Sequence, residues 1–157
     1  MKSINLTKGF VAHIDDDDEW VLSGRKWVAS FSGRRWYVVR GKGKTREYLH
    51  RLIANAGKGV VVDHIDGDTM NNTRSNLRLC SQQENTWNSK SRKSCSGFKG
   101  VAKHQGKWTA RLTINGKNLY LGLFETKEDA AISYNNAAIK HFGSFARLNN
   151  VTNAKIT

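Results

Sequence analysis

The sequence is poor in cysteine, proline and acidic residues, and it has no long apolar run. Cys80 and Cys95 are the only cysteines, too few for a disulfide framework or a thiolate zinc site. Proline is absent, and this absence indicates no particular function. No window approaches the roughly 18 to 20 apolar residues of a membrane span, and the start MKSINLTKGF lacks the apolar core of a signal peptide. We therefore expect an intracellular, cytoplasmic protein with no membrane partner.

Basic residues outnumber acidic ones two to one. The 157 residues include 26 Lys and Arg against 13 Asp and Glu, a net charge of +13, which indicates a polyanionic partner such as nucleic acid. Segment 57–85 is the exception, with three basic and four acidic residues. It is also the segment richest in Asp, Asn and His. A bound cation would explain this local reversal, with ordinary loop chemistry as the alternative. The length suits one ordinary domain or two small ones.

The first fifty residues alternate short apolar runs with turn signals. Strands are expected over 9–14, 26–30, 35–40 and 45–49, with a short helix over 17–23, which together predict a small antiparallel meander. The acidic run from Asp15 to Asp18 resembles a metal cage only superficially, because four consecutive acids cannot all face one ion. A solvated turn is the better interpretation of this run.

The middle of the chain predicts a strand, a long polar loop, a second strand and a helix. Helical spacing over 48–56 precedes a β-branched run at 60–62, a loop over 63–76 and a strand over 77–80. Ser81 and Glu84 form the capping-box pattern of a helix that continues to about residue 88. Segment 89–96 is rich in Ser and Lys, which predicts a flexible linker and a domain boundary.

Within this order lies a constellation of polar residues: Asp63, His64, Asn76 and Asn85. Together with the strand–loop–strand–helix order, it resembles the HNH nuclease family and its ββα-metal fold over about residues 47–90. The resemblance implies that His64 is the general base and that Asn76 gives His64 structural support. It also implies that Asp63 and Asn85 bind one divalent cation, Mg²⁺ or alternatively Mn²⁺, whose preference for oxygen fits these side chains.

Two features of this constellation leave alternatives open. Adjacent residues on a regular strand face opposite sides, so Asp63 and His64 share a site only if the strand ends or bulges there. Asn88 lies one turn beyond Asn85 on the expected helix and is the alternative metal ligand. Segment 66–68 has turn chemistry, and His50 is better explained by packing or phosphate contact than by catalysis.

Three further strands and a helix are expected after the linker. The strands cover 101–104, 107–114 and 118–124, and Asn115-Gly116 between the last two favours a type I′ hairpin turn. Thr126 and Asp129 form another capping box, which begins a helix with small residues on one face that ends at Gly143. Trp108 and Phe124 are expected in the core rather than in base stacking.

Residues 97–149 resemble the Apetala-type DNA-binding domain of ethylene-response factors, on motifs such as 120–124 and the ending 142–149. The resemblance implies that the sheet lies in the major groove of DNA. It carries over these contacts: Lys99, Lys103, His104, Arg111, Thr113, Asn118 and Tyr120. Ala102, Thr113 and Asn118 stand where plant members have Arg, so the plant target sequence does not transfer. In the linker, Lys90, Arg92 and Lys93 are expected to contact phosphates.

We therefore predict an α+β protein with a small N-terminal meander, a ββα-metal core, and a three-stranded antiparallel sheet packed on one helix. The expected regions are 1–88, the linker 89–96, 97–149 and a tail over 150–157. The predicted activity is a metal-dependent DNA endonuclease of the phage or intron-borne homing type, which cuts double-stranded DNA to 5′-phosphate and 3′-hydroxyl ends. One such site cuts one strand, so double-strand cutting needs a homodimer or a second event. A catalytically silent DNA-binding regulator and an RNA-binding protein are the alternatives.

Overall fold

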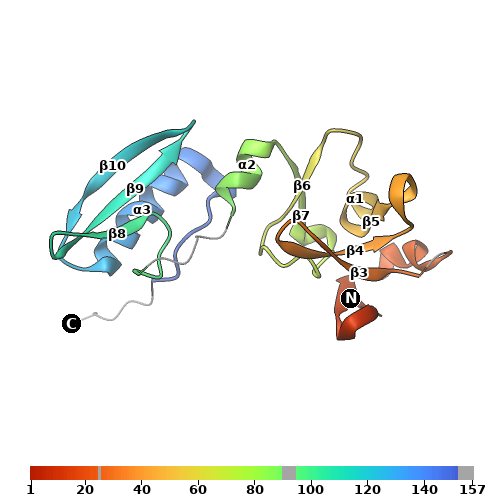
Figure 1. Ribbon diagram of the computed structural model, residues 1–157. Helices are drawn as coiled ribbons and strands as arrows, with labels where there is room; N and C mark the ends of the chain where they lie inside the picture. Colours follow the sequence, from red (N-terminus) through yellow and green to blue (C-terminus); the bar gives the residue numbers. More distant parts are fainter. Residues whose placement is uncertain (25, 90–94, 152–157) are drawn as a thin grey trace. The chain divides into compact units, whose positions relative to one another are not determined.

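The chain divides into two compact units, Met1–Asn85 and Thr86–Thr157. The computed structural model describes residues 1–24, 26–89 and 95–151. Each unit combines antiparallel strands with short helices, which confirms the expected α+β class (Figure 1). The linker predicted over 89–96 lies mostly outside the described residues, so its bounds remain a prediction. No described helix has both the length and the apolar character that crossing a membrane requires.

The first unit begins with two small sheets. Its elements are β1 (Lys2–Asn5), η1 (Thr7–Gly9), β2 (Val11–Ile14), η2 (Asp16–Leu22), β3 (Val28–Ser32), β4 (Arg35–Arg40), η3 (Gly43–Thr45) and β5 (Glu47–Tyr48). β1 pairs with β2, and β4 lies between β3 and β5. The sheet of β3, β4 and β5 is the expected small antiparallel meander, but β2, the first of the four expected strands, pairs with β1 instead of joining it. The sequence pattern missed β1 because Ile4 is its only apolar residue.

The strand–loop–strand–helix order that we expected is present in the second half of this unit. It consists of α1 (Leu49–Ile53), β6 (Val61–His64), η4 (Arg74–Asn76), β7 (Leu77–Cys80) and the first part of α2 (Gln82–Trp87), which extends past the end of the unit at Asn85. One hydrophobic core joins this part to the N-terminal sheets. It includes these buried side chains: Ile14, Val21, Trp27, Val38, Leu49, Ile53 and Met70. Burial of a large apolar side chain contributes roughly 1.5–3 kcal/mol, so this shared core fixes the loop between β6 and β7 against the sheets.

The acidic segment at the start of η2 anchors the same loop. Asp18 is fully buried and binds the guanidinium of Arg74 at 2.6 and 3.0 Å, while Asp15 accepts a hydrogen bond from the Arg74 amide at 2.7 Å. The expectation of a wholly solvated turn is therefore wrong for Asp18. A buried carboxylate needs a partner, and Arg74 supplies it from 56 residues away along the chain. β2 also holds the loop, because His13 pairs with its backbone near Asn71.

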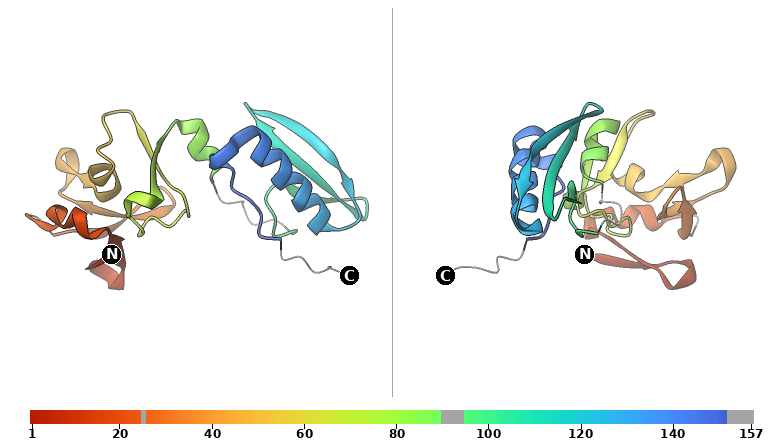
Figure 2. Two further views of the ribbon diagram at one scale, coloured as in Figure 1. Left: turned by 180° about the vertical axis from the view of Figure 1, so that it is seen from behind. Right: turned by 60° about the vertical axis from the view of Figure 1, so that its left-hand side comes forward.

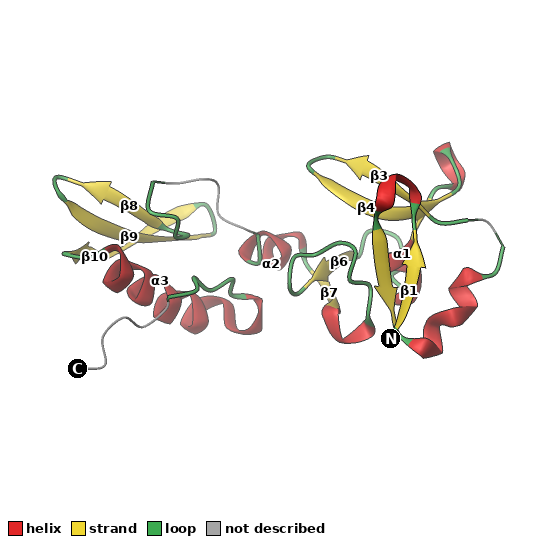
Figure 3. Ribbon diagram, turned by 90° about the horizontal axis from the view of Figure 1, so that it is seen from below, coloured by secondary structure: helices red, strands yellow, loops and turns green. Residues whose placement is uncertain are grey.

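The second unit is a three-stranded sheet covered by one helix. β8 (Val101–His104), β9 (Lys107–Ile114) and β10 (Lys117–Phe124) form an antiparallel sheet with β9 in the centre. α3 (Lys127–Phe142), followed by η5 (Gly143–Phe145), runs along one face of the sheet (Figures 2 and 3). The small residues expected on α3 are largely buried there, together with Tyr134. This arrangement leaves the opposite face of the sheet uncovered within the described part of the unit.

Local signals in this unit fix its turns and helix start as predicted. Asn115 and Gly116 both have positive φ, 51° and 76°, as a type I′ turn requires. The Thr126 side chain accepts a hydrogen bond from the Asp129 amide at 3.1 Å and caps α3.

Candidate active site

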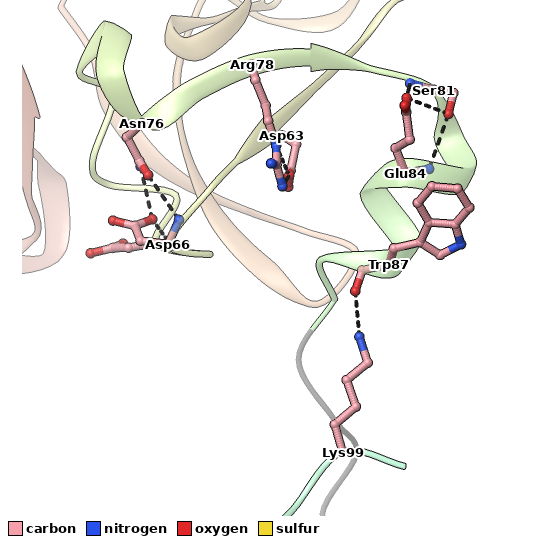
Figure 4. Close-up of polar contacts among 9 residues, drawn as sticks. Asp63, Asp66, Asn76, Arg78, Ser81, Glu84, Trp87 and Lys99 are labelled. Carbon is pink, nitrogen blue, oxygen red and sulfur yellow. Dashed lines mark hydrogen bonds and ion pairs between the residues drawn. The ribbon is translucent and has the colours of Figure 1, made fainter. Parts of the chain in front are cut away.

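Asn76 ties together the loop between β6 and β7. Its side-chain oxygen accepts a hydrogen bond from the Asp66 amide at 3.0 Å, and its Nδ2 donates to Asp66 Oδ1 and to the Asn71 carbonyl (Figure 4). The backbone adds a bond from Ile65 N to Asn76 O at 2.9 Å. These contacts hold the residues directly after His64, the supporting position that we expect for Asn76.

The acidic residues of the loop form turns. Asp66 Oδ1 accepts a hydrogen bond from the Asp68 amide at 2.7 Å, and Asp68 Oδ1 accepts one from the Met70 amide at 2.9 Å. Partial burial raises the pKa of Asp66, but hydrogen bonds from Asp68, Asn71 and Asn76 outweigh it and lower the pKa. Asp66 therefore stays ionised and acts as an acceptor, consistent with the turn chemistry expected for 66–68.

Asn72 determines which nitrogen of His64 carries a proton. Its Nδ2 donates to the carbonyls of Thr69 and Met70, at 3.3 and 2.9 Å, which directs its Oδ1 toward His64 Nε2 at 3.5 Å. Because this oxygen can only accept, Nε2 is the donor, and the lone pair of a neutral ring then lies on Nδ1. Asn72 is fully buried, so this arrangement is rigid. No local sequence pattern singles out Asn72.

Burial keeps the imidazole of His64 neutral. It lowers the pKa of His64, although the hydrogen bond to Asn72 and the nearby carboxylates of Asp66 and Asp63 oppose this shift. His50 packs against His64 with 5.1 Å between ring centroids, and burial lowers its pKa to about 3. The buried Nδ1 of His50 has no hydrogen-bond partner among the described residues. Two neutral imidazoles therefore lie side by side, one of them oriented by Asn72.

Asp63 is paired with Arg78 on the neighbouring strand. The two residues face each other in the β6–β7 register, and Arg78 Nε and Nη2 donate to Asp63 Oδ2 at 2.9 and 2.7 Å (Figure 4). Both side chains are largely buried, at 15% and 6% exposure. A buried carboxylate is stable only with such a counter-charge. β6 ends at His64, one of the two conditions under which adjacent Asp63 and His64 can share a site.

The capping box predicted at Ser81 begins α2 and thereby positions Asn85. Glu84 accepts hydrogen bonds from the amide and the hydroxyl of Ser81, both at 2.8 Å, while the Glu84 amide donates to Ser81 Oγ at 3.2 Å (Figure 4). These bonds lower the pKa of Glu84. Asn88, the alternative ligand, lies in the turn that directly follows α2.

A cavity of about 350 Å³ brings the predicted residues together. Asp63, His64 and Asn85 line it, whereas Asn76 supports the loop beside it. The cavity is also lined by residues outside the predicted constellation, among them Arg35, Tyr37, Tyr48, His50 and Thr69. Except for His50, no local motif singles these residues out: the N-terminal sheet carries Arg35, Tyr37 and Tyr48, and Thr69 lies in the loop between β6 and β7.

The oxygen donors of this cavity fit a hard divalent cation. Asp63 offers a carboxylate and Asn85 an amide carbonyl, and Mg²⁺ commonly uses one or two protein oxygens while keeping several waters. Among the described residues, no group of three or more His, Cys, Asp or Glu side chains is placed to hold a metal. A site here would therefore rest on few protein ligands and complete its shell with water and substrate phosphate.

The uncovered face of the C-terminal sheet gathers most of the predicted DNA contacts. Arg111 pairs across the strands with Tyr120, and Thr113 pairs with Asn118 through a 2.8 Å hydrogen bond. All four are exposed, and Arg111 and Thr113 alternate along β9 with the buried Ala110 and Leu112, which pack toward α3. His104 pairs with Lys107 on the same side by strand alternation. The face thus carries cations, hydroxyls, an amide and an aromatic ring together.

Three other groups of predicted contacts are placed differently. Lys103 pairs with Trp108 and so lies on the opposite side of its strand from His104. Lys99 donates to the carbonyls of Trp87 and Ser89 at 2.6 and 2.8 Å, and burial lowers its pKa to about 8 (Figure 4). This position favours a structural role for Lys99. The predicted phosphate contacts of the linker, Lys90, Arg92 and Lys93, lie outside the described residues.

Comparison with known proteins finds two kinds of similarity. The family model of the HNH endonucleases matches residues 47–86. A protein of Acanthamoeba polyphaga mimivirus named uncharacterized HNH endonuclease L560 is 34% identical, over 92% of this chain and 77% of its own length. Protein 3.8 of Escherichia phage T7 is 39% identical over 57% of this chain and 76% of its own length. An AP2-like ethylene-responsive transcription factor of Arabidopsis thaliana is 47% identical over 40% of this chain, but only 18% of its own length.

Proposed function

The chain belongs to the HNH endonuclease family, and we propose that it hydrolyses phosphodiester bonds of double-stranded DNA with the help of one divalent cation. The observation that carries this proposal is the shared cavity of Asp63, His64 and Asn85. These three residues supply a neutral imidazole and two oxygen donors around one space. A nuclease needs a base for water and a positive charge near the phosphate, and this arrangement can provide both.

In this proposal His64 is the general base. It takes a proton from water through Nδ1 while the water oxygen attacks the phosphorus atom. Its position is supported by Asn72, which fixes the proton on Nε2, and by the hydrogen bonds of Asn76 in the following loop. The P–O3′ bond then breaks, and the leaving oxygen takes up a proton. The products are a 5′-phosphate and a 3′-hydroxyl end.

Asp63 and Asn85 would hold the cation, with Mg²⁺ expected and Mn²⁺ as the alternative. Bound there, the ion would stabilise the negative charge that develops on the phosphate and on the leaving oxygen. Arg78 pairs with the carboxylate of Asp63 and holds it in place, and a fixed orientation of a ligand by its neighbours strengthens metal binding. The capped first turn of α2 similarly fixes Asn85.

We further propose that the C-terminal sheet binds DNA through His104, Arg111, Thr113, Asn118 and Tyr120. The exposed sheet face and the similarity to AP2-like transcription factors support this role. Cutting and binding then belong to different regions, as in an enzyme of the homing type that cuts at or near a specific site. The mimivirus and phage sources of two relatives support a virus- or phage-infected cell as the setting. One site cuts one strand, so a double-strand break requires a second copy or a second event.

Metal binding and product ends test this proposal separately. Mn²⁺ binding, followed by electron paramagnetic resonance, is expected to weaken about 10- to 100-fold in Asn85→Ala. It is expected to be unchanged in Asn88→Ala, the matched control. Supercoiled plasmid nicked by the wild type in Mg²⁺ should be resealed by DNA ligase alone, because ligase requires a 5′-phosphate and a 3′-hydroxyl. Equal Mn²⁺ binding by both variants contradicts the ligand assignment, and nicks that ligase cannot seal contradict the hydrolysis.

A further inference from the structure

We propose that Arg35, at the tip of the β3–β4 hairpin, binds a backbone phosphate of the DNA strand being cut. The N-terminal sheet is then part of the substrate site and not only a support for it. This inference rests on the proposed function, because it names a substrate contact of the same cavity. The hairpin lies outside residues 47–86, which match the family model, so the contact belongs to this chain's own N-terminal region.

Arg35 lies at the cavity, close to His64. Arg35 lines the cavity together with Asp63, His64 and Asn85. Its Nη1 donates to the Gly67 carbonyl at 3.5 Å, and the Gly67 amide in turn donates to the His64 carbonyl at 2.9 Å. The guanidinium therefore lies beside the turn that directly follows His64, in the cavity where the proposed function places the scissile phosphate.

The arginines of the first unit differ in the partners of their guanidinium groups. Arg40, Arg74 and Arg78 each bind a carboxylate at 2.6 to 2.7 Å. Arg51 instead donates to three backbone carbonyls. Arg35 is half-buried, and among the described residues no carboxylate lies within ion-pair distance of it; its one hydrogen bond, to Gly67, is long. A half-buried cation without an acidic partner favours an anionic ligand, and the fork of a guanidinium fits phosphate oxygens.

The hairpin that carries Arg35 has a short turn. Ser32 and Arg35 pair directly, so the connection between β3 and β4 is a turn of two residues, Gly33 and Arg34. Gly33 has a φ of 64°, as the first position of a type II′ turn requires. Such a short turn places Arg35 reproducibly beside the cavity. Arg34 is exposed and is not among the described residues that line the cavity, although it carries the same charge one position earlier.

Arg34 therefore provides the matched control for the experiment. Single-turnover nicking of supercoiled plasmid in Mn²⁺ is measured for the wild type, Arg35→Ala, Arg35→Lys and Arg34→Ala. Binding to a random-sequence 30-bp duplex is measured in EDTA by fluorescence anisotropy over a range of salt concentrations. Loss of one charge-assisted contact should slow nicking about 10- to 100-fold in Arg35→Ala, with partial recovery in Arg35→Lys and a change under about threefold in Arg34→Ala. Thermal unfolding of each variant identifies any variant that does not fold. If Arg35→Ala does not fold, the nicking rate of Arg35→Lys decides the test.

The binding data distinguish this inference from the proposed function. Loss of a phosphate contact should reduce the slope of log affinity against log salt by about 0.9 in Arg35→Ala. If the wild type nicks DNA and Arg35→Ala matches it in both nicking rate and salt slope, the inference is overturned and the nuclease stands. If the wild type does not nick but the slope still falls in Arg35→Ala, the phosphate contact is supported and the hydrolysis is contradicted. Equal effects in Arg34→Ala and Arg35→Ala overturn the specific role of Arg35.

Discussion

At the scale of single residues, the environment of His64 is built from neutral and oriented groups. Asn72 accepts from Nε2, and His50 packs edge-on at 5.1 Å without adding a charge. Neither contact follows from sequence spacing alone, because both depend on how the loop folds back. The motif also does not predict the Asp63–Arg78 pair, because this pair depends on the register of β6 and β7. By contrast, the motif by itself singled out Asp63, His64 and Asn85, which all line the cavity.

The buried neutral His50 predicts a specific dependence of stability on pH. In the unfolded chain a histidine takes up a proton near pH 6.5, but His50 in the folded protein stays neutral until about pH 3. The unfolded state therefore binds more protons between these values, and the free energy of unfolding falls as the pH drops from 6.5 toward 3. His50→Phe removes this contribution and retains a ring among Tyr37, Tyr48 and His64.

Urea unfolding at pH 7 and pH 5 measures this effect. The wild type should lose more stability than His50→Phe over this interval, by up to about 1.4 kcal/mol per pH unit. Identical losses in the two proteins would show that His50 is not held neutral by burial.

At the scale of elements, the sequence predicted features that depend on neighbouring residues, but not pairings between distant segments. Ser81 with Glu84 and Thr126 with Asp129 identified the starts of α2 and α3, because a capping box acts within one helical turn. The Asn115-Gly116 turn was also local. The interpretation of Asp15 to Asp18 failed for Asp18, because its partner Arg74 comes from a different part of the chain. Arg35 reaches the cavity through the same kind of distant packing.

Gly100 is an element-scale test of how the sheet packs on α3. It has a φ of 75°, and a Cβ there would lie 2.2 Å from the ring of Tyr134 and 2.5 Å from the Arg111 carbonyl oxygen. Gly100→Ala should therefore destabilise the protein by about 3 kcal/mol or more, from backbone strain and overpacking together. Gly106 also has a positive φ, 83°, but open space around it. Gly106→Ala should cost only about 1 kcal/mol.

Urea denaturation compares these two glycine variants directly. A cost for Gly100→Ala no larger than that for Gly106→Ala would mean that the contact of Gly100 with Tyr134 on α3 is looser than described.

At the scale of the whole molecule, a net charge of +13 supports two kinds of contact with DNA. Composition indicated a polyanionic partner, but it did not indicate where the basic residues gather. The fold places Arg111 with four other predicted contacts on one sheet face and Arg35 in the cavity of the other unit. The sequence predicts neither placement, because strand alternation and sheet packing determine which side chains lie together.

Salt dependence distinguishes the sheet face from the helix-covered face of the C-terminal unit. In duplex DNA each phosphate contact contributes about −0.9 to the slope of log affinity against log salt, so binding should weaken steeply with salt. Arg111→Ala should reduce this slope by about one. Lys140→Ala removes the same charge from the exposed side of α3 and should leave the slope unchanged. A larger effect from Lys140 than from Arg111 would move the interface to the helix.

The most direct test of the central claim is nicking of supercoiled DNA by the wild type and by His64→Ala, in Mg²⁺ and in EDTA. His141→Ala, which changes an exposed histidine at the end of α3, is the control. We expect the wild type and His141→Ala to convert the DNA to relaxed or linear product in Mg²⁺ only. His64→Ala should be at least about 100-fold slower while still binding DNA. Cutting by His64→Ala at the wild-type rate, or wild-type cutting that continues in EDTA, would contradict a metal-dependent nuclease centred on His64.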